Sequence, residues 1–252
     1  MKFTFTKKMN RYFIYLGLRV VIFIIILVLY LTRRDEMLMF MRQPVRLGIT
    51  LSHVIWVIFM VIMVLHLFPN KLRSMARLKA EKKHFDPVEG YSEVKLLKNH
   101  LEENRKAWIV MLCWLSLNAI FGVLYLSHVI AESDLFMLTI FFFLSDYVCI
   151  MFFCPFQTFI MKNRCCINCR IYDWGHFMIF TPMLFIKSFY SWSLFFTALL
   201  VLIRWEVAYT RYPERFWSGS NKALQCQNCK DKTCQIKRGL AEKFRKRKGT
   251  HL

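Results

Sequence analysis

The sequence has few glycines and few acidic residues. Its eight glycines are scattered and do not form the glycine-rich loops that cradle phosphates. No GxSxG, HExxH or Walker motif occurs, so the sequence offers no hydrolase centre of those kinds and no nucleotide-binding loop. Many secondary transporters have apolar segments that are broken by glycine or proline at matching positions in the two halves of the chain. This sequence does not show that pattern.

Acidic residues number only 16 against 36 lysines and arginines, which gives a formal net charge of +20. Hydrophobic residues make up 56% of the chain and aromatic residues 17%, more apolar surface than one soluble domain of this length needs to bury. These proportions predict an all-α, polytopic integral membrane protein. In such a protein an excess of positive charge first reports topology, so a nucleic-acid partner is not favoured.

Apolar runs of about 20 residues predict the membrane-spanning helices. The runs are 12–31, 48–68, 107–130, 135–160 and 174–204. The last is too long for one span at about 1.5 Å per residue, and Lys187 and Ser188 offer a turn within it. We therefore expect six spans. The first run is longer than the apolar part of a signal peptide and has no small-residue cleavage site after it, so we expect it to remain uncleaved.

Basic residues gather on one side of this predicted topology. Four precede residue 12, ten lie at 71–106 and thirteen follow from Arg204 onward, whereas the opposite side keeps five. The positive-inside rule therefore places both termini in the cytoplasm, as in a multi-pass protein of the cell membrane. The basic C-terminal tail is expected to contact anionic lipid headgroups.

Six units follow from the spans and the polar segments between them. They are a first helix pair at 1–68, a cytoplasmic helical connector at 69–106, a second hairpin at 107–161, a cysteine-rich loop at 162–173, a third hairpin at 174–208 and a cysteine-rich basic tail at 209–252. The connector is expected to form two short helices, the second capped by Ser92.

Six cysteines stand in two short groups outside the apolar runs. The first cysteine group is Cys165, Cys166 and Cys169, and the second cysteine group is Cys226, Cys229 and Cys234. Each contains a CxxC pair, whose turn can bring two thiolates to one ion. Both groups are expected on the cytoplasmic face, where thiols stay reduced, so a shared metal site is expected rather than disulfides.

A four-thiolate set predicted for this site combines Cys165 or Cys166 with Cys169, Cys226 and Cys229. Zinc and an iron-sulfur cluster are both compatible with four thiolates, so the spacing leaves the cofactor open. If all six cysteines bind metal, a cluster or a second ion is required. The other three cysteines, Cys113, Cys149 and Cys154, are expected to be small apolar core residues.

Two polar residues within the apolar runs mark a second candidate site. Asp146 is predicted either to relay protons or cations or to pair with His128, Asn118 or a hydroxyl group, because an ionisable side chain in hydrocarbon faces the bundle interior. His176 is predicted either to bind a metal or quinone or to be hydrogen-bonded and inert. Arg19 is expected to extend toward the membrane surface.

These features predict a membrane protein with a cysteine-ligated metal site on its cytoplasmic face, acting in electron transfer or metal sensing with a redox or membrane protein partner. One alternative is a non-enzymatic scaffold or transporter-like protein whose zinc is purely structural. Another is a channel or carrier that uses Asp146.

Overall fold

The computed structural model describes residues 7–42, 44–46, 49–68, 75–163, 165–229, 232 and 234–237. The α-helices are α1 (Lys7–Thr32), α2 (Arg34–Arg42), α3 (Leu51–Leu67), α4 (Met75–Leu78), α5 (Glu93–Leu126), α6 (Glu132–Met151), α7 (Gly175–Phe180) and α8 (Phe189–Arg211). Short turns of 3-10 or π helix are η1 (Lys82–His84), η2 (Phe156–Ile160), η3 (Tyr172–Trp174), η4 (Thr181–Phe185), η5 (Pro213–Arg215), η6 (Lys222–Leu224) and η7 (Cys226–Asn228). One antiparallel pair of strands, β1 (Pro44–Arg46) and β2 (Ile49–Thr50), precedes α3. The fold is thus predominantly helical, as predicted.

Four helices, α1, α5, α6 and α8, are long and apolar enough to cross a membrane. Large apolar side chains on their surfaces are exposed, among them Leu18 and Val21 on α1 and Leu112 and Val123 on α5. Exposed apolar faces of this length would be unstable in water, and hydrocarbon is the solvent that suits them. The helices therefore indicate membrane association.

The remaining two expected spans are shorter. Helix α3 is apolar but has 17 residues. The long run 174–204 is divided where expected, because η4 ends at Phe185 and α8 begins at Phe189. Its first part, α7 with 6 residues and η4 with 5, is about 19 Å long, roughly two thirds of the thickness of the hydrocarbon layer.

Two helix boundaries differ from the sequence prediction. Helix α6 ends at Met151 rather than near residue 160, because Pro155 has no backbone N–H to continue the hydrogen-bond pattern. The connector does not contain a separate second helix. Ser92 caps a single 34-residue helix, α5, by accepting a hydrogen bond from the Lys95 N–H, and this helix runs unbroken to Leu126.

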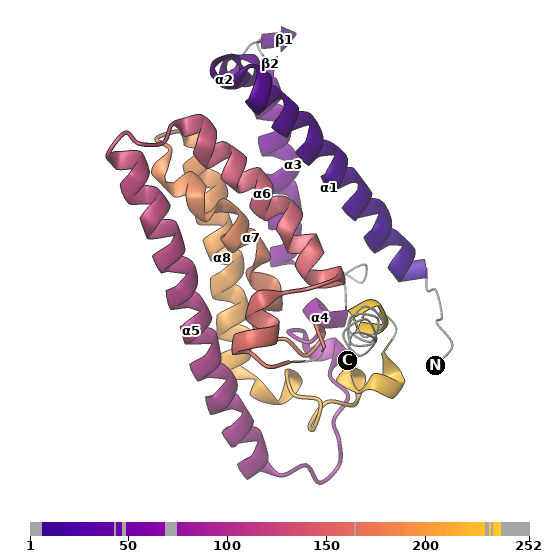
Figure 1. Ribbon diagram of the computed structural model, residues 1–252. Helices are drawn as coiled ribbons and strands as arrows, with labels where there is room; N and C mark the ends of the chain where they lie inside the picture. The colour runs from indigo at the N-terminus through magenta and orange to yellow at the C-terminus, as the bar shows by residue number, and fades with distance from the viewer. Residues whose placement is uncertain are drawn as a thin grey trace, which may run out of the picture.

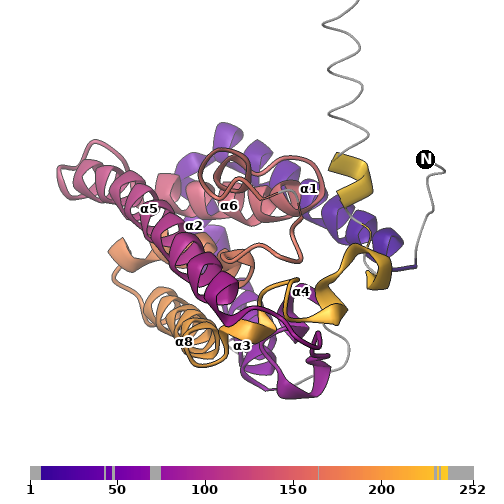
Figure 2. The same ribbon diagram turned by 90° about the horizontal axis from the view of Figure 1, so that it is seen from below.

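Helix α1 packs on α6, α3 packs on α8, and α7 lies between α6 and α8 (Figure 1). The first turn of α1 and the last turn of α8 lie at the same end of the bundle (Figure 1). We call this end, formed by residues 75–92, 152–163, 165–174, 212–229 and 234–237, the polar end, and Figure 2 looks onto it. The α2 helix and the β1–β2 pair lie at the opposite end (Figure 1).

Backbone hydrogen bonds hold the segments of the polar end together. The Lys222 N–H donates to the Asp86 carbonyl at 2.7 Å, and the Val88 N–H donates to the Ser220 carbonyl at 3.0 Å. A buried aromatic cluster that includes Trp174, Trp205 and Phe216 lies beneath them. The connector that precedes α5 is thus hydrogen-bonded to the segment that carries the second cysteine group.

Candidate functional site

The two cysteine groups meet at the polar end. The side chains of Cys165 and Cys234 lie close enough to interact, because Cys234 is the largest influence on the pKa of Cys165. Cys165 and Cys229 also pack against one small buried cluster made by Ala76, Ile167 and Leu224. Three cysteines that are far apart in the sequence, Cys165, Cys229 and Cys234, therefore lie around one region of the structure.

The surroundings of Cys165 favour its thiolate. The Cys234 side chain, followed by the backbone N–H groups of Ile167 and Asn168, lowers the pKa of Cys165 to about 6, whereas burial acts in the opposite direction. Cys229 is placed similarly, because its sulfur accepts the Lys232 N–H at 3.4 Å. The thiolate is the form of cysteine that binds metal ions and acts as a nucleophile.

Cys166 and Cys169 have other neighbours. The Cys166 sulfur accepts a hydrogen bond from Lys237 Nζ at 2.9 Å and lies 3.4 Å from Gln157 Oε1. Cys169 is buried in the aromatic cluster, and this burial raises its pKa to about 12. In the absence of a metal ion, Cys169 is therefore a neutral thiol at neutral pH.

The four-thiolate set suggested by spacing is not assembled in the described part of the chain. Cys226 is exposed, whereas Cys169 is buried. Among the described residues, no three side chains of His, Cys, Asp or Glu stand close enough together to hold a metal ion. The contact that the structure shows between the two groups is the one between Cys165 and Cys234.

A second cysteine pair was not anticipated from the sequence. The side chains of Cys149 and Cys154 lie close enough to interact. The Cys149 side chain, and after it the Gln157 N–H, lowers the pKa of Cys154 to about 7 against the effect of burial. The break after α6 brings the two sulfurs together, so Pro155 between α6 and η2 was the available signal. Cys113, expected in the core, is exposed on α5.

Lys237 lies between the two cysteine pairs. Its ammonium group donates to the Cys149 carbonyl at 2.7 Å, to Gln157 Oε1 at 2.6 Å and to the Cys166 sulfur at 2.9 Å. The start of the C-terminal tail is thereby attached to the end of α6. The rest of the basic tail, residues 238–252, lies outside the described residues, as does the predicted headgroup contact.

Asp146 is paired with Arg19, at 3.0 Å between Oδ2 and a guanidinium nitrogen. The guanidinium carbon also lies 3.9 Å from the ring centre of Phe143 and 4.0 Å from that of Tyr147. Asp146 is thus paired inside the bundle, as one of the predicted alternatives had it, but with Arg19 rather than with His128, Asn118 or a hydroxyl group. Helices α1 and α6 pack together, and an internal ion pair satisfies the two opposite charges in place of water.

A glycine allows the Asp146 carboxylate to lie against α7. A Cβ atom built at Gly175 would come within 2.6 Å of Asp146 Oδ1, closer than real Cβ atoms approach. The first residue of α7 must therefore lack a side chain for the carboxylate to remain in this position.

His176 belongs to a chain of polar contacts that joins four helices. Its Nε2 lies 2.8 Å from Nδ1 of His66, and the other ring nitrogen of His66 lies 2.7 Å from Arg77. Arg77 in turn pairs with Asp173 at 2.6 Å, and Arg204 donates to the His66 carbonyl at 2.6 Å. His176 is thus hydrogen-bonded, and sequence reasoning missed His66 because the two histidines are 110 residues apart.

These elements define a helical, membrane-associated protein with paired cysteines at one end and a chain of buried polar groups leading into its bundle. Comparisons with models of known families, with curated proteins and with solved structures found no match to this chain.

Proposed function

We propose that this chain is a multi-pass membrane protein whose polar end faces the cytoplasm and carries a thiolate metal site. The observation that carries the proposal is the proximity of the Cys165 and Cys234 side chains, which brings the two cysteine groups together. The topology is supported by the basic residues, because ten of them lie at 71–106 and thirteen from Arg204 onward. The described parts of these two segments meet at this end.

The proposed ligands are Cys165, Cys226, Cys229 and Cys234. Cys165 supplies a thiolate at neutral pH, and the N–H donors around it and around Cys229 stabilise negative charge on sulfur. Cys226 and Cys229 are separated by the single turn η7, the spacing typical of paired ligands in zinc sites. Metal binding requires this turn to close on the Cys165–Cys234 pair.

Zinc and an iron-sulfur cluster can both be bound by four thiolates. The role that we propose for the site is electron transfer or metal sensing, with a redox or membrane protein as the partner. The alternative is a scaffold in which zinc joins the C-terminal segment to the loop after α6 and stabilises the fold without chemistry. Lys79 and Lys237 near the cysteines favour thiolates in either case.

Metal analysis of protein purified without oxygen tests the proposal. We expect about one equivalent of zinc, or iron with a visible absorption band, and we expect loss of the metal in Cys165→Ser and Cys234→Ser. Cys113→Ser, on the surface of α5, is the control. Cys166→Ala separates the two ligand sets, because this variant should keep its metal. Metal-free wild-type protein, or variants of Cys165 and Cys234 that bind metal normally, would contradict the proposal.

The Cys165–Cys234 contact also favours a second function, reversible dithiol and disulfide exchange at the membrane surface. One activated thiolate beside a second thiol is the arrangement that such exchange uses. Differential alkylation followed by mass spectrometry separates the two functions. A disulfide between Cys165 and Cys234 that forms with mild oxidant in metal-free protein supports exchange, whereas its absence leaves metal binding as the function to test.

A further inference from the structure

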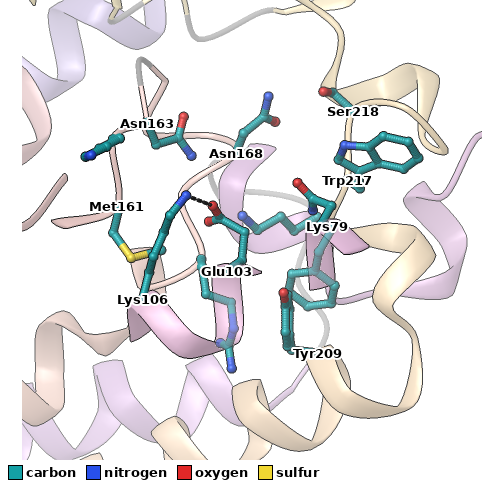
Figure 3. A pocket seen from close by; sticks show the side chains of 13 residues that line it. Lys79, Glu103, Lys106, Met161, Asn163, Asn168, Tyr209, Trp217 and Ser218 are labelled. Atoms are coloured by element: carbon teal, nitrogen blue, oxygen red, sulfur yellow. Dashed lines mark hydrogen bonds and ion pairs between the residues drawn. The ribbon is translucent and has the colours of Figure 1, made fainter. Parts of the chain in front are cut away.

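A cavity of about 230 Å³ opens at the polar end, beside the first turns of α5 and the last turns of α8. Four basic side chains, from Lys79, Lys106, Lys162 and Arg170, line it together with one carboxylate, that of Glu103. These four cations and one anion leave a formal charge of +3 on the lining. Figure 3 shows Lys79, which follows α4, and Glu103 and Lys106 of α5 pointing toward the same space.

Two of the four cations already have carboxylate partners. Lys106 pairs with Glu103 at 3.2 Å (Figure 3) and with Glu102 at 2.8 Å. Arg170 donates to both carboxylate oxygens of Glu206, a neighbour on α8 that does not line the cavity. These pairs hold the walls in place and neutralise their own charge.

Lys79 and Lys162 form no ion pair with a carboxylate among the described residues. Lys162 is exposed, so water solvates its charge. Lys79 is only 2% exposed. Its ammonium group donates to the carbonyls of Ile167 at 2.7 Å and Cys169 at 2.9 Å, which leaves one of its three donors for another acceptor.

A buried ammonium without a countercharge is costly, so proteins almost always pair it. The carbonyls and the rings of Trp205 and Phe216, 5.2 and 5.5 Å away, reduce this cost only in part, because they carry no full negative charge. The Cys165 thiolate also attracts the ammonium, but it is not among its hydrogen-bond partners. An anion in the cavity would supply the direct countercharge that Lys79 lacks.

The rest of the lining suggests a ligand with hydroxyl groups as well. Three amides, from Asn99, Asn163 and Asn168, line the cavity. The Asn168 Oδ1 atom is buried and accepts no hydrogen bond. A buried acceptor of this kind needs a donor, and a phosphate oxygen without its proton cannot provide one. The aromatic rings of Tyr209 and Trp217 give the ligand an apolar wall.

We infer that this cavity binds a small phosphate ester that carries hydroxyl groups, of the glycerol phosphate type. Its volume of about 230 Å³ lies below the range of about 300–1,000 Å³ for drug-sized ligands, so it suits a headgroup rather than a nucleotide. The ligand could come from solution or from an anionic lipid, because α5 and α8 are both candidate membrane spans.

Binding measurements with two probes test the inference and distinguish the sources. Purified protein in detergent is titrated with glycerol 3-phosphate by calorimetry, and protein in nanodiscs containing phosphatidylglycerol is examined by native mass spectrometry. Titratable binding of glycerol 3-phosphate supports a ligand from solution. Retained phosphatidylglycerol without such binding supports a lipid headgroup. Absence of both overturns the inference.

Variants of the lining decide whether binding occurs in this cavity. We expect Lys79→Met to weaken binding about tenfold or more, because it removes one charged hydrogen bond. Lys162→Gln, a surface change that leaves the core intact, should weaken it several-fold. Lys95→Gln, on the exposed start of α5 and away from the cavity, is the control. Equal losses in Lys95→Gln and Lys162→Gln would overturn the inference, since they would report general surface charge.

Discussion

The titration of Cys165 is the sharpest test of the polar end. In metal-free protein, the Cys234 side chain and the N–H groups of Ile167 and Asn168 hold the pKa of Cys165 at about 6. At pH 7 a thiol with that pKa is about nine-tenths thiolate, whereas one near 9 is about 1% thiolate. The rate of alkylation of Cys165 should therefore rise between pH 5 and pH 7 and be flat above.

The midpoint of this rise is more informative than its height. A pKa lowered by about three units increases the thiolate fraction at pH 7 roughly 90-fold. The same change lowers the intrinsic reactivity of the thiolate roughly 20-fold, for a Brønsted slope of about 0.4–0.5. The two effects leave a net gain of only a few-fold, which steric access to a half-buried sulfur can hide. The pH of half-maximal rate does not depend on such access.

The assay is pulse alkylation with iodoacetamide between pH 5 and pH 10, with the labelled fraction of the Cys165 peptide read by mass spectrometry. Cys234→Ser should move the midpoint upward, because Cys234 contributes the largest pKa-lowering effect at Cys165. Cys113→Ser should leave it unchanged. A wild-type midpoint near 9, or one that does not move in Cys234→Ser, would refute the arrangement described for the two cysteine groups.

Three further predictions concern the core and the buried charges. Asp146→Asn should destabilise the fold by about 3 kcal/mol, the lower end for buried ion pairs, because 14% and 23% of the two side chains remain exposed. Adding Arg19→Leu to the same chain should restore most of the lost stability, measured by unfolding in detergent. Losses that simply add in the double variant would argue against the ion pair. Gly175→Ala should lower the stability by about 1–3 kcal/mol, because the added Cβ meets the Asp146 carboxylate. Gly17→Ala, with open space around the added Cβ, should cause no loss. Equal effects of the two changes would contradict the close approach of Gly175 and Asp146. Burial lowers the pKa of Lys79 to about 8 from 10.5, so the charge of Lys79 opposes folding below pH 8. The free energy of unfolding should therefore rise by up to about 3 kcal/mol between pH 8 and pH 10.5. The same rise in Lys79→Met would contradict the assignment of this pH dependence to Lys79.

Much of the helical framework could be predicted from local sequence. The apolar runs correspond to α1, α3, α5, α6 and α8, because a run of about 20 apolar residues has few stable alternatives to a helix in hydrocarbon. The break near Lys187 was visible as a polar interruption. The boundary after α6 was misjudged, because the residues after Pro155 are as apolar as those before it, and hydropathy does not register a missing N–H.

The candidate sites were predicted less completely. The two cysteine groups stood out by spacing, and Asp146 stood out as a charge in an apolar run. The partners of these residues did not stand out. Arg19 lies 127 residues from Asp146, and neither its sequence neighbours nor its spacing indicates which helix it faces. The Cys149–Cys154 pair was overlooked because isolated cysteines in an apolar run usually behave as small core residues.

The sequence by itself determined the class of the protein, since composition and hydropathy act through the solvent each segment prefers and need no knowledge of the neighbours. It also determined which residue types gather at the polar end. Only the tertiary structure decided that Cys165 and Cys234 meet, while Cys166 and Cys169 contact other residues. It also decided that Arg19 pairs with Asp146, and that Lys79 is buried without a carboxylate partner. Each of these depends on distances between segments far apart in the chain, and such distances are set by how the helices pack.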